Sequence, residues 1–144
     1  KALAFGAAQR GAHVKVANRN IDRARELVKS IKGAEAVSLE EIACGSVSGD
    51  VLANTTAVGM HPMEGDTPVE KSALGKYALA FDAIYTPMET RLLAEAKAEG
   101  CVTVSGLEMF VGQAVKQFEY FTGEAAAAEV VTLMRNVVMD SLKK

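Results

Sequence analysis

Two arginine side chains stand beside a turn near the start of the chain. Val14 and Val16 alternate with polar neighbours, which predicts a short strand. The turn Asn18-Arg19-Asn20 follows directly, and Arg23 comes soon after it. A guanidinium can hold a phosphate group through two parallel hydrogen bonds, whereas a carboxylate would repel it. The turn therefore indicates a phosphate site, and solvated charges at a strand–helix corner are the alternative that spacing alone leaves open.

The same residues bear on which dinucleotide would bind at the turn. In a dinucleotide-binding fold the second strand ends beside the adenosine ribose, where an acidic residue binds the 2′-hydroxyl of NAD. This chain has Asn18 and Arg19 in that place. A charge-assisted hydrogen bond is worth about 1.5–3 kcal/mol, which corresponds to about ten- to a hundredfold in affinity. The pattern therefore favours NADP over NAD.

Polar loops follow two further predicted strands. The apolar run 50–54 has the composition of a strand buried on both faces of a parallel sheet, and it leads into Asn54-Thr55-Thr56. The run 78–85 ends at Tyr85, just before a proline. Ligands of open α/β sheets bind at the carboxyl ends of the strands. Both loops are therefore candidate binding loops, with local backbone hydrogen bonding as the alternative for the first and a core position for Tyr85.

Strand and helix patterns alternate along the whole chain, which predicts an α/β fold with a doubly wound parallel sheet. The expected strands are 14–16, 35–37, 50–54, 78–85 and 101–104, and the expected helices are 1–10, 21–31, 39–42, 73–74, 107–121 and 130–138. A further helix is expected to carry Leu92, Leu93 and Ala96 and to end at Gly100. The chain starts inside a helical pattern, without a methionine, leading strand or glycine-rich loop. We therefore expect the fold to be truncated at its N-terminus.

Several helix ends and faces can be predicted from residue types. Asn20 is the expected N-cap of one helix, and Ser38 with Glu41 forms a capping box for the next. Thr86 and Thr90 are rival N-caps of the helix that Gly100 ends. The expected core face of the helix 107–121 consists of Phe110, Ala114, Phe118 and Phe121. A final amphipathic helix is marked by Val130, Leu133, Met134, Val137 and Val138.

Composition excludes several classes of function. The net charge of −2 gives no basic field that would recruit nucleic acid or anionic lipid. No apolar run is long enough to cross a membrane. The two cysteines, Cys44 and Cys101, and the two histidines, His13 and His61, have no ligand-like spacing, so neither a metal site nor a disulfide is expected.

Four motifs in register resemble the NADP-binding half of shikimate dehydrogenases. They are Asn18-Arg19-Asn20 with Arg23, Asn54-Thr55-Thr56 with Gly59-Met60, Asp82-Ala83-Ile84-Tyr85-Thr86-Pro87 with Thr90, and Ser105-Gly106 with Met109 and Gln113-Ala114. The run 108–114 and the segments that follow it are similar to the plant bifunctional form, in which a 3-dehydroquinate dehydratase module precedes the dehydrogenase. The resemblance implies a Rossmann-like fold that covers residues 1–144 as one NADP-binding domain.

The resemblance also implies roles for individual residues. Asn20 stands where the family has threonine and keeps a polar helix cap. Tyr85 and Gln113 match residues that bind substrate hydroxyls, although the residue pattern alone favours a solvated helical position for Gln113. The positions that match cofactor-binding residues are Asn18, Arg19, Asn20, Arg23, Asn54, Thr55, Thr56, Gly106 and Met109. The family's catalytic lysine and aspartate lie in a separate substrate domain N-terminal to this one, so no catalytic residue is expected in this chain.

The implied reaction is the NADP-dependent interconversion of 3-dehydroshikimate and shikimate in aromatic amino-acid biosynthesis. The expected partners are the small-molecule substrate and a substrate domain in the same full-length chain, with no nucleic acid and no membrane. A plastid is the expected compartment if the plant-type resemblance holds, and the cytoplasm otherwise. The alternatives are a quinate dehydrogenase of the same fold, a non-catalytic nucleotide-binding module and an interaction domain without a ligand. We expect this stretch alone to be inactive and marginally stable, because a missing central strand would leave backbone groups unpaired.

Overall fold

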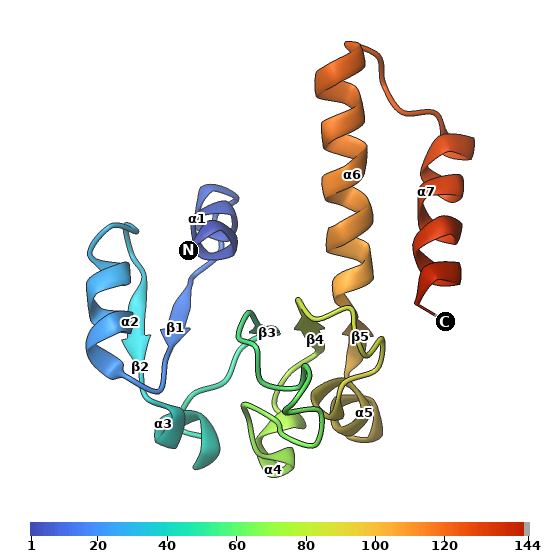
Figure 1. The fold of residues 1–144 in the computed structure, drawn as a ribbon. Helices are drawn as coiled ribbons and strands as arrows, with labels where there is room; N and C mark the ends of the chain where they lie inside the picture. Colours follow the sequence, from blue (N-terminus) through green and yellow to red (C-terminus); the bar gives the residue numbers. More distant parts are fainter. Residues whose placement is uncertain (143–144) are drawn as a thin grey trace. The chain divides into compact units, whose positions relative to one another are not determined.

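A computed structural model describes residues 1–142 (Figure 1). The chain forms two compact units, Lys1–Ser48 and Gly49–Lys144. All strand pairs are parallel, in a two-stranded sheet in the first unit and a three-stranded sheet in the second. Strands and helices alternate along the chain, so the predicted α/β class is confirmed.

The first unit places one short parallel sheet beside helix α2. Its elements are α1 (Ala2–Gln9), β1 (Lys15–Ala17), α2 (Ile21–Val28), β2 (Glu35–Val37) and α3 (Leu39–Ala43). Lys15 lies opposite Glu35, and Ala17 lies opposite Val37. The buried residues of this unit are Ala24, Ile31, Val37 and Ile42. This small core fixes the β1–α2 turn that carries the arginines.

Two predicted helix starts in this unit are confirmed. The Asn20 side chain accepts a hydrogen bond from the backbone N–H of Asp22 at 3.0 Å, which caps α2. The Ser38 hydroxyl accepts from the N–H of Glu41 at 3.1 Å, and the Glu41 carboxylate accepts from the N–H of Ser38 at 2.7 Å. These bonds satisfy amides that have no partner inside their own helix.

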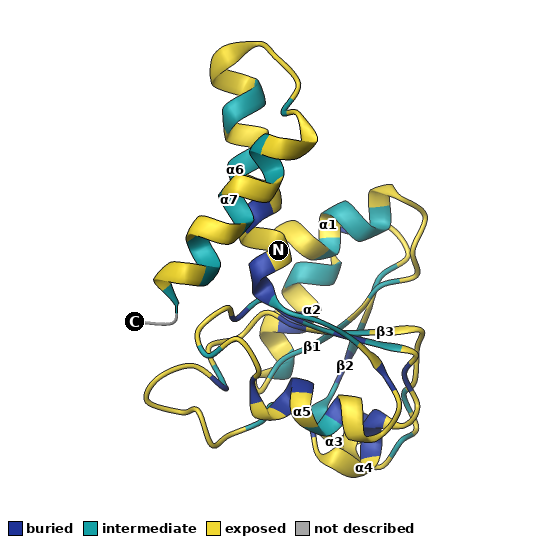
Figure 2. Ribbon diagram, turned by 90° about the vertical axis from the view of Figure 1, so that its right-hand side faces the viewer, coloured by how far each residue is buried: buried dark blue, intermediate teal, exposed yellow. Residues whose placement is uncertain are grey.

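The second unit is built on the sheet order β3-β4-β5. Its elements are β3 (Val51–Asn54), α4 (Lys71–Leu74), β4 (Leu79–Asp82), α5 (Arg91–Ala98), β5 (Val102–Val104), α6 (Gly106–Thr122) and α7 (Ala128–Ser141). Figure 2 shows buried residues gathered on α4 and α5, and Leu74, Leu92 and Ala96 are almost completely buried there. Of the rival N-caps, Thr90 starts α5, because its hydroxyl accepts from the N–H of Leu93. Thr86 does not.

The prediction that the strand 50–54 is buried on both faces is wrong. Val51 is 57% exposed, and Val102 is 62% exposed. The register puts both on the same face of the sheet as Leu79, whereas Ala80 on the other face is fully buried. Helix α5 packs on β4 and β5, so within this unit only one face of the sheet is well covered. A short apolar run has no polar face, and for that reason its composition cannot show which side is open.

The predicted core face of α6 is wrong in part, whereas the predicted final helix is present as α7. In α6 the buried residues are Gly106, Leu107 and Val111, all near its start, whereas Phe121 is 82% exposed. No residue of α7 is buried, and Leu133 and Val137 are well exposed. Only the first turns of α6 reach the sheet, and α7 packs along α6 (Figure 1). Periodicity identified both helices but could not show how far along them the core extends.

An ion pair joins α6 and α7. The Arg135 guanidinium donates to both carboxylate oxygens of Glu108, with an Nη2–Oε2 distance of 2.6 Å. This bond lowers the pKa of Glu108 and raises the pKa of Arg135. The two side chains are 45% and 36% exposed, so the pair is worth at most about 1 kcal/mol.

Acidification should remove the contribution of this pair to stability. Because the folded-state pKa of Glu108 is lowered, the contribution is fully present above about pH 4.3 and is lost as the pH falls through the lowered value. Urea unfolding of the complete protein should show Glu108→Gln less stable than the native sequence near pH 7 and equally stable in strong acid. Glu124→Gln, at an exposed loop position, is the control. A difference that persists in acid would assign the effect to packing.

Candidate functional site

The turn between β1 and α2 is folded by two asparagine side chains. Asn18 Oδ1 accepts a hydrogen bond from the backbone N–H of Asn20 at 2.9 Å, and Asn20 Oδ1 in turn caps α2. Both oxygens are thus used in shaping the turn. Arg19 lies between Asn18 and Asn20 in sequence, and its side chain takes no part in these two hydrogen bonds. The turn is a rigid support for a guanidinium.

The arginines at this turn differ in whether their charge is already paired. Arg25 Nη1 lies 3.0 Å from Asp22 Oδ1. Arg19 and Arg23 are exposed, and no ion pair joins either of them to an acidic side chain within residues 1–142. Arg23 stands in the first turn of α2, where the helix dipole also favours an anion. The arrangement can therefore take a phosphate group without breaking an existing ion pair.

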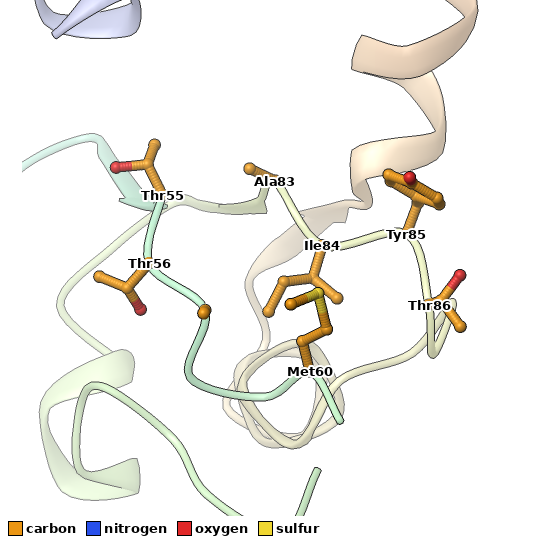
Figure 3. A pocket seen from close by; sticks show the side chains of 8 residues that line it. Thr55, Thr56, Met60, Ala83, Ile84, Tyr85 and Thr86 are labelled. Carbon is orange, nitrogen blue, oxygen red and sulfur yellow. The ribbon is translucent and has the colours of Figure 1, made fainter. Parts of the chain in front are cut away.

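A pocket of about 360 Å³ lies in the second unit, at the carboxyl ends of β3 and β4. Figure 3 shows its walls on two loops, with Thr55, Thr56 and Met60 on one and Ala83, Ile84, Tyr85 and Thr86 on the other. Ala57 completes the first wall. The position agrees with the general location of ligand sites in open parallel sheets. The lining is mostly apolar with a few hydroxyl groups, which suits an aromatic or sugar ring.

The predicted residue Asn54 is buried beneath this pocket, with 4% of its surface exposed. Its Oδ1 accepts from the N–H and the hydroxyl of Thr56, at 2.9 and 2.8 Å. Its Nδ2 donates to the Val58 carbonyl at 3.1 Å and to Asp82 Oδ1 at 3.0 Å. These bonds occupy its donors and acceptors. Asn54 therefore shapes the loop, and the exposed Thr55 and Thr56 form the wall.

Tyr85 lies at the rim of the pocket and is 38% exposed. Its ring packs on Phe110 with a centroid distance of 5.0 Å and an interplanar angle of 40°. Phe110 belongs to α6, so this contact aligns the second loop with that helix. The interpretation of Phe110 as a core residue missed this role. Gln113 is exposed one turn further along α6, which places it on the side of the helix that Tyr85 contacts.

Gly106 begins α6 against the backbone of the second loop. Its N–H donates to the Ile84 carbonyl at 3.0 Å. A Cβ at this position would lie 2.1 Å from the Ala83 carbonyl oxygen. Met109, in the first turn of α6, is 45% exposed and does not line the pocket. The backbone contact is a reason for glycine here that the sequence did not reveal.

Most of the predicted site residues thus fall into two groups, whereas Met109 and Gln113 lie on α6 outside the pocket lining. Thr55, Thr56 and Tyr85 line one pocket, and Asn54 and Gly106 support its walls. The other group, Asn18-Arg19-Asn20 and Arg23, shares one turn in the first unit. Asp82 and Thr90 were named as parts of one motif, but the hydrogen bond between them and its role in shaping the site were missed. A carboxylate directly at the end of an apolar strand was the signal that could have found Asp82.

Known proteins are similar to this chain in sequence and in fold. Residues 106–139 match the family described as the shikimate 5′-dehydrogenase C-terminal domain. Over 131 residues, 90% of this chain, it is 53% identical to the chloroplastic bifunctional 3-dehydroquinate dehydratase/shikimate dehydrogenase of Arabidopsis thaliana. Over about nine tenths of its own length the chain is similar to shikimate dehydrogenases. This confirms the resemblance drawn from the four motifs, including its likeness to the plant bifunctional form.

Solved structures support the same conclusion and the Rossmann-like fold. The shikimate 5-dehydrogenase of Thermus thermophilus, in complex with NADP(H) and shikimate, matches 94% of this chain with 30% identity and a TM-score of 0.81. The quinate dehydrogenase of Corynebacterium glutamicum, in complex with NAD, matches 94% with 30% identity and a TM-score of 0.83. The chain spans 49% of each of these proteins and 22% of the plant enzyme.

None of the helices within residues 1–142 combines the length and the apolar character that crossing a bilayer requires.

Proposed function

We propose that this chain is the NADP-binding domain of an enzyme that interconverts 3-dehydroshikimate and shikimate. The observation that carries the proposal is the pair of exposed, unpaired guanidiniums at the β1–α2 turn, in a chain that is similar to shikimate dehydrogenases. Arg19 and Arg23 suit the 2′-phosphate that distinguishes NADP from NAD. NADP would supply the hydride chemistry when bound. The residues of this chain bind and orient the reactants.

The pocket of the second unit supports the nicotinamide side of the proposed site. Thr55 supplies a hydroxyl on one wall, and Thr56 lines the same wall with its hydroxyl bonded to Asn54. Gly106 and Met109 begin the helix next to the other wall. The mostly apolar lining suits a flat ring. Asn18, Asn20 and Asn54 take part by holding their loops in shape.

Tyr85 and Gln113 are the proposed contacts to the substrate. The Tyr85 ring is oriented by Phe110, and its hydroxyl can bond a substrate oxygen. Gln113 adds an amide on the same side of α6. By the family resemblance, the lysine and aspartate that handle the hydroxyl proton belong to the substrate domain. We propose that this domain lies in the same full-length chain, so that residues 1–144 contribute one wall of the cleft.

Changing either substrate contact should weaken shikimate binding and spare the cofactor. Tyr85→Phe keeps the ring contact with Phe110 and removes one hydrogen bond, and Gln113→Ala removes an amide. Each should raise KM for shikimate about three- to tenfold, because a neutral hydrogen bond is worth about 0.5–1.5 kcal/mol. Gln117→Ala, an exposed glutamine one turn further along α6, is the matched control. A rise in KM for NADP alone would assign both residues to the cofactor.

The experiment that tests the proposed function is a dehydrogenase assay of the complete protein. Reduction of NADP⁺ in the presence of shikimate, followed by absorbance, is the expected result. No turnover of shikimate with either dinucleotide would overturn the proposal.

A quinate dehydrogenase is the second candidate, because a solved quinate dehydrogenase shares the fold at a TM-score of 0.83. That structure holds NAD. The arginine pair of this chain favours NADP and so favours the first candidate. The ratio of kcat/KM for shikimate and quinate in the same assay discriminates between the two.

We also propose a plastid location for the complete protein, since the Arabidopsis thaliana relative is chloroplastic. Imaging a fluorescent fusion of the complete protein in plant cells tests this. Cytoplasmic fluorescence would contradict it.

A further inference from the structure

A carboxylate is buried directly beneath the pocket. Asp82 ends β4 and has no exposed surface. No ion pair joins it to a basic side chain within residues 1–142. A buried carboxylate must be matched by hydrogen-bond donors, because desolvation otherwise makes it strongly destabilising. The hydrogen-bond donors to Asp82 therefore identify the segments that this residue links.

Three donors meet on this one carboxylate, and each comes from a different segment. Asp82 Oδ1 accepts from Asn54 Nδ2 at 3.0 Å and from the backbone N–H of Ile84 at 3.1 Å. Asp82 Oδ2 accepts from the Thr90 hydroxyl at 2.7 Å. The donors lie at the end of β3, in the loop after β4, and at the N-cap of α5.

The bond to Asn54 extends the network into the first wall of the pocket. Asn54 holds Thr56 through two hydrogen bonds and Val58 through one. The bond to Ile84 fixes the start of the second wall, which runs on to Tyr85. Both walls of the pocket are therefore fastened to one carboxylate.

A carboxylate suits this arrangement. An ionised carboxylate accepts hydrogen bonds and donates none, and all of its neighbours here are donors. Asparagine has nearly the same shape, but its amide N–H groups would face the Thr90 hydroxyl, which here donates to Asp82 Oδ2 and already accepts from the N–H of Leu93. Part of the network would be left without partners in a buried site.

We propose that Asp82 is a positioning residue that sets the spacing of the two pocket walls, so that cofactor binding and substrate binding depend on the same buried carboxylate. The inference rests on the proposed function for the identity of the ligands. Asp82 acts on NADP binding through Thr56 and on shikimate binding through Tyr85.

The test compares variants of the complete protein by steady-state kinetics and by amide hydrogen exchange. Asp82→Asn should raise KM for NADP and KM for shikimate together, each about tenfold, the scale of one lost hydrogen bond to a charged group. The backbone amide hydrogens of residues 55–60 and 83–86 should exchange with solvent faster in the same variant. Asp66→Asn, which alters an exposed carboxylate, is the matched control and should change none of these quantities.

Thr90 provides a milder pair of variants if Asp82→Asn does not fold. Thr90→Ser keeps the hydroxyl that Asp82 accepts from and should behave like the native sequence. Thr90→Val keeps the shape and removes the hydroxyl, so both KM values should rise and both loops should exchange faster.

Two outcomes would overturn the proposal. One is a lower unfolding temperature with both KM values and loop exchange unchanged, which would make the network purely structural. The other is faster exchange in only one loop. If the native protein does not oxidise shikimate with NADP⁺, the proposed function fails, and the exchange of the two loops still decides whether Asp82 positions them together.

Discussion

Replacing Arg19 by alanine in the complete protein should weaken NADP binding about ten- to a hundredfold and leave NAD binding nearly unchanged. The side chain is exposed on a turn that two asparagines hold in shape, and no ion pair within residues 1–142 neutralises it. Its loss should therefore remove a contact to the 2′-phosphate without disturbing α2. NAD lacks that phosphate, so its affinity gives the internal reference. Dissociation constants of both dinucleotides from fluorescence titration measure the effect.

Arg25→Ala is the matched control for this prediction. Arg25 is also exposed and lies on α2, but it is paired with Asp22 at 3.0 Å. Its removal should change neither dinucleotide affinity appreciably. Arg23→Ala should resemble Arg19→Ala, and losing both guanidiniums should erase the preference for NADP. Equal losses for NADP and NAD in Arg19→Ala would contradict the assignment of the turn to the 2′-phosphate.

Adding one methyl group at Gly106 should disrupt the pocket. The new Cβ would lie 2.1 Å from the Ala83 carbonyl oxygen and 2.7 Å from the Ile84 carbonyl carbon. Both are backbone atoms, so neither can rotate away, and α6 or the second loop must move. Overpacking of this kind costs about 1–3 kcal/mol or more. Gly106→Ala should lower the unfolding temperature of the complete protein by several degrees and reduce kcat/KM for shikimate about a hundredfold or more.

Gly112→Ala in the same helix is the control for this prediction. A Cβ at Gly112 meets no atom within 4 Å. Alanine is about 1 kcal/mol better than glycine inside a helix, so this variant should be as stable as the native sequence or more stable. Full activity and an unchanged unfolding temperature in Gly106→Ala would show that the α6 start is not held against Ala83 as the structure has it.

Much of the local structure was determined by short-range chemistry that the sequence displays. Asn20 and Ser38 cap the helices that follow them, because their side-chain oxygens need only an amide two or three residues ahead. The Asn18-Arg19-Asn20 turn was likewise visible, since its hydrogen bonds and its guanidinium belong to neighbouring residues. The alternation of strands and helices predicted the α/β class for a similar reason.

Only the tertiary structure decided which faces are buried and which polar residues meet. Phe121 and Val51 are apolar and well exposed, because burial depends on what packs opposite and not on the residue alone. Asp82 and Asn54 are far apart in sequence and 3.0 Å apart in space, since parallel pairing brings the ends of β3 and β4 to one edge of the sheet. Gly106 is confined by the Ala83 carbonyl, a long-range contact that no local pattern encodes. Local hydrogen bonds can be predicted from neighbouring residues, whereas packing between distant segments exists only once the chain has folded.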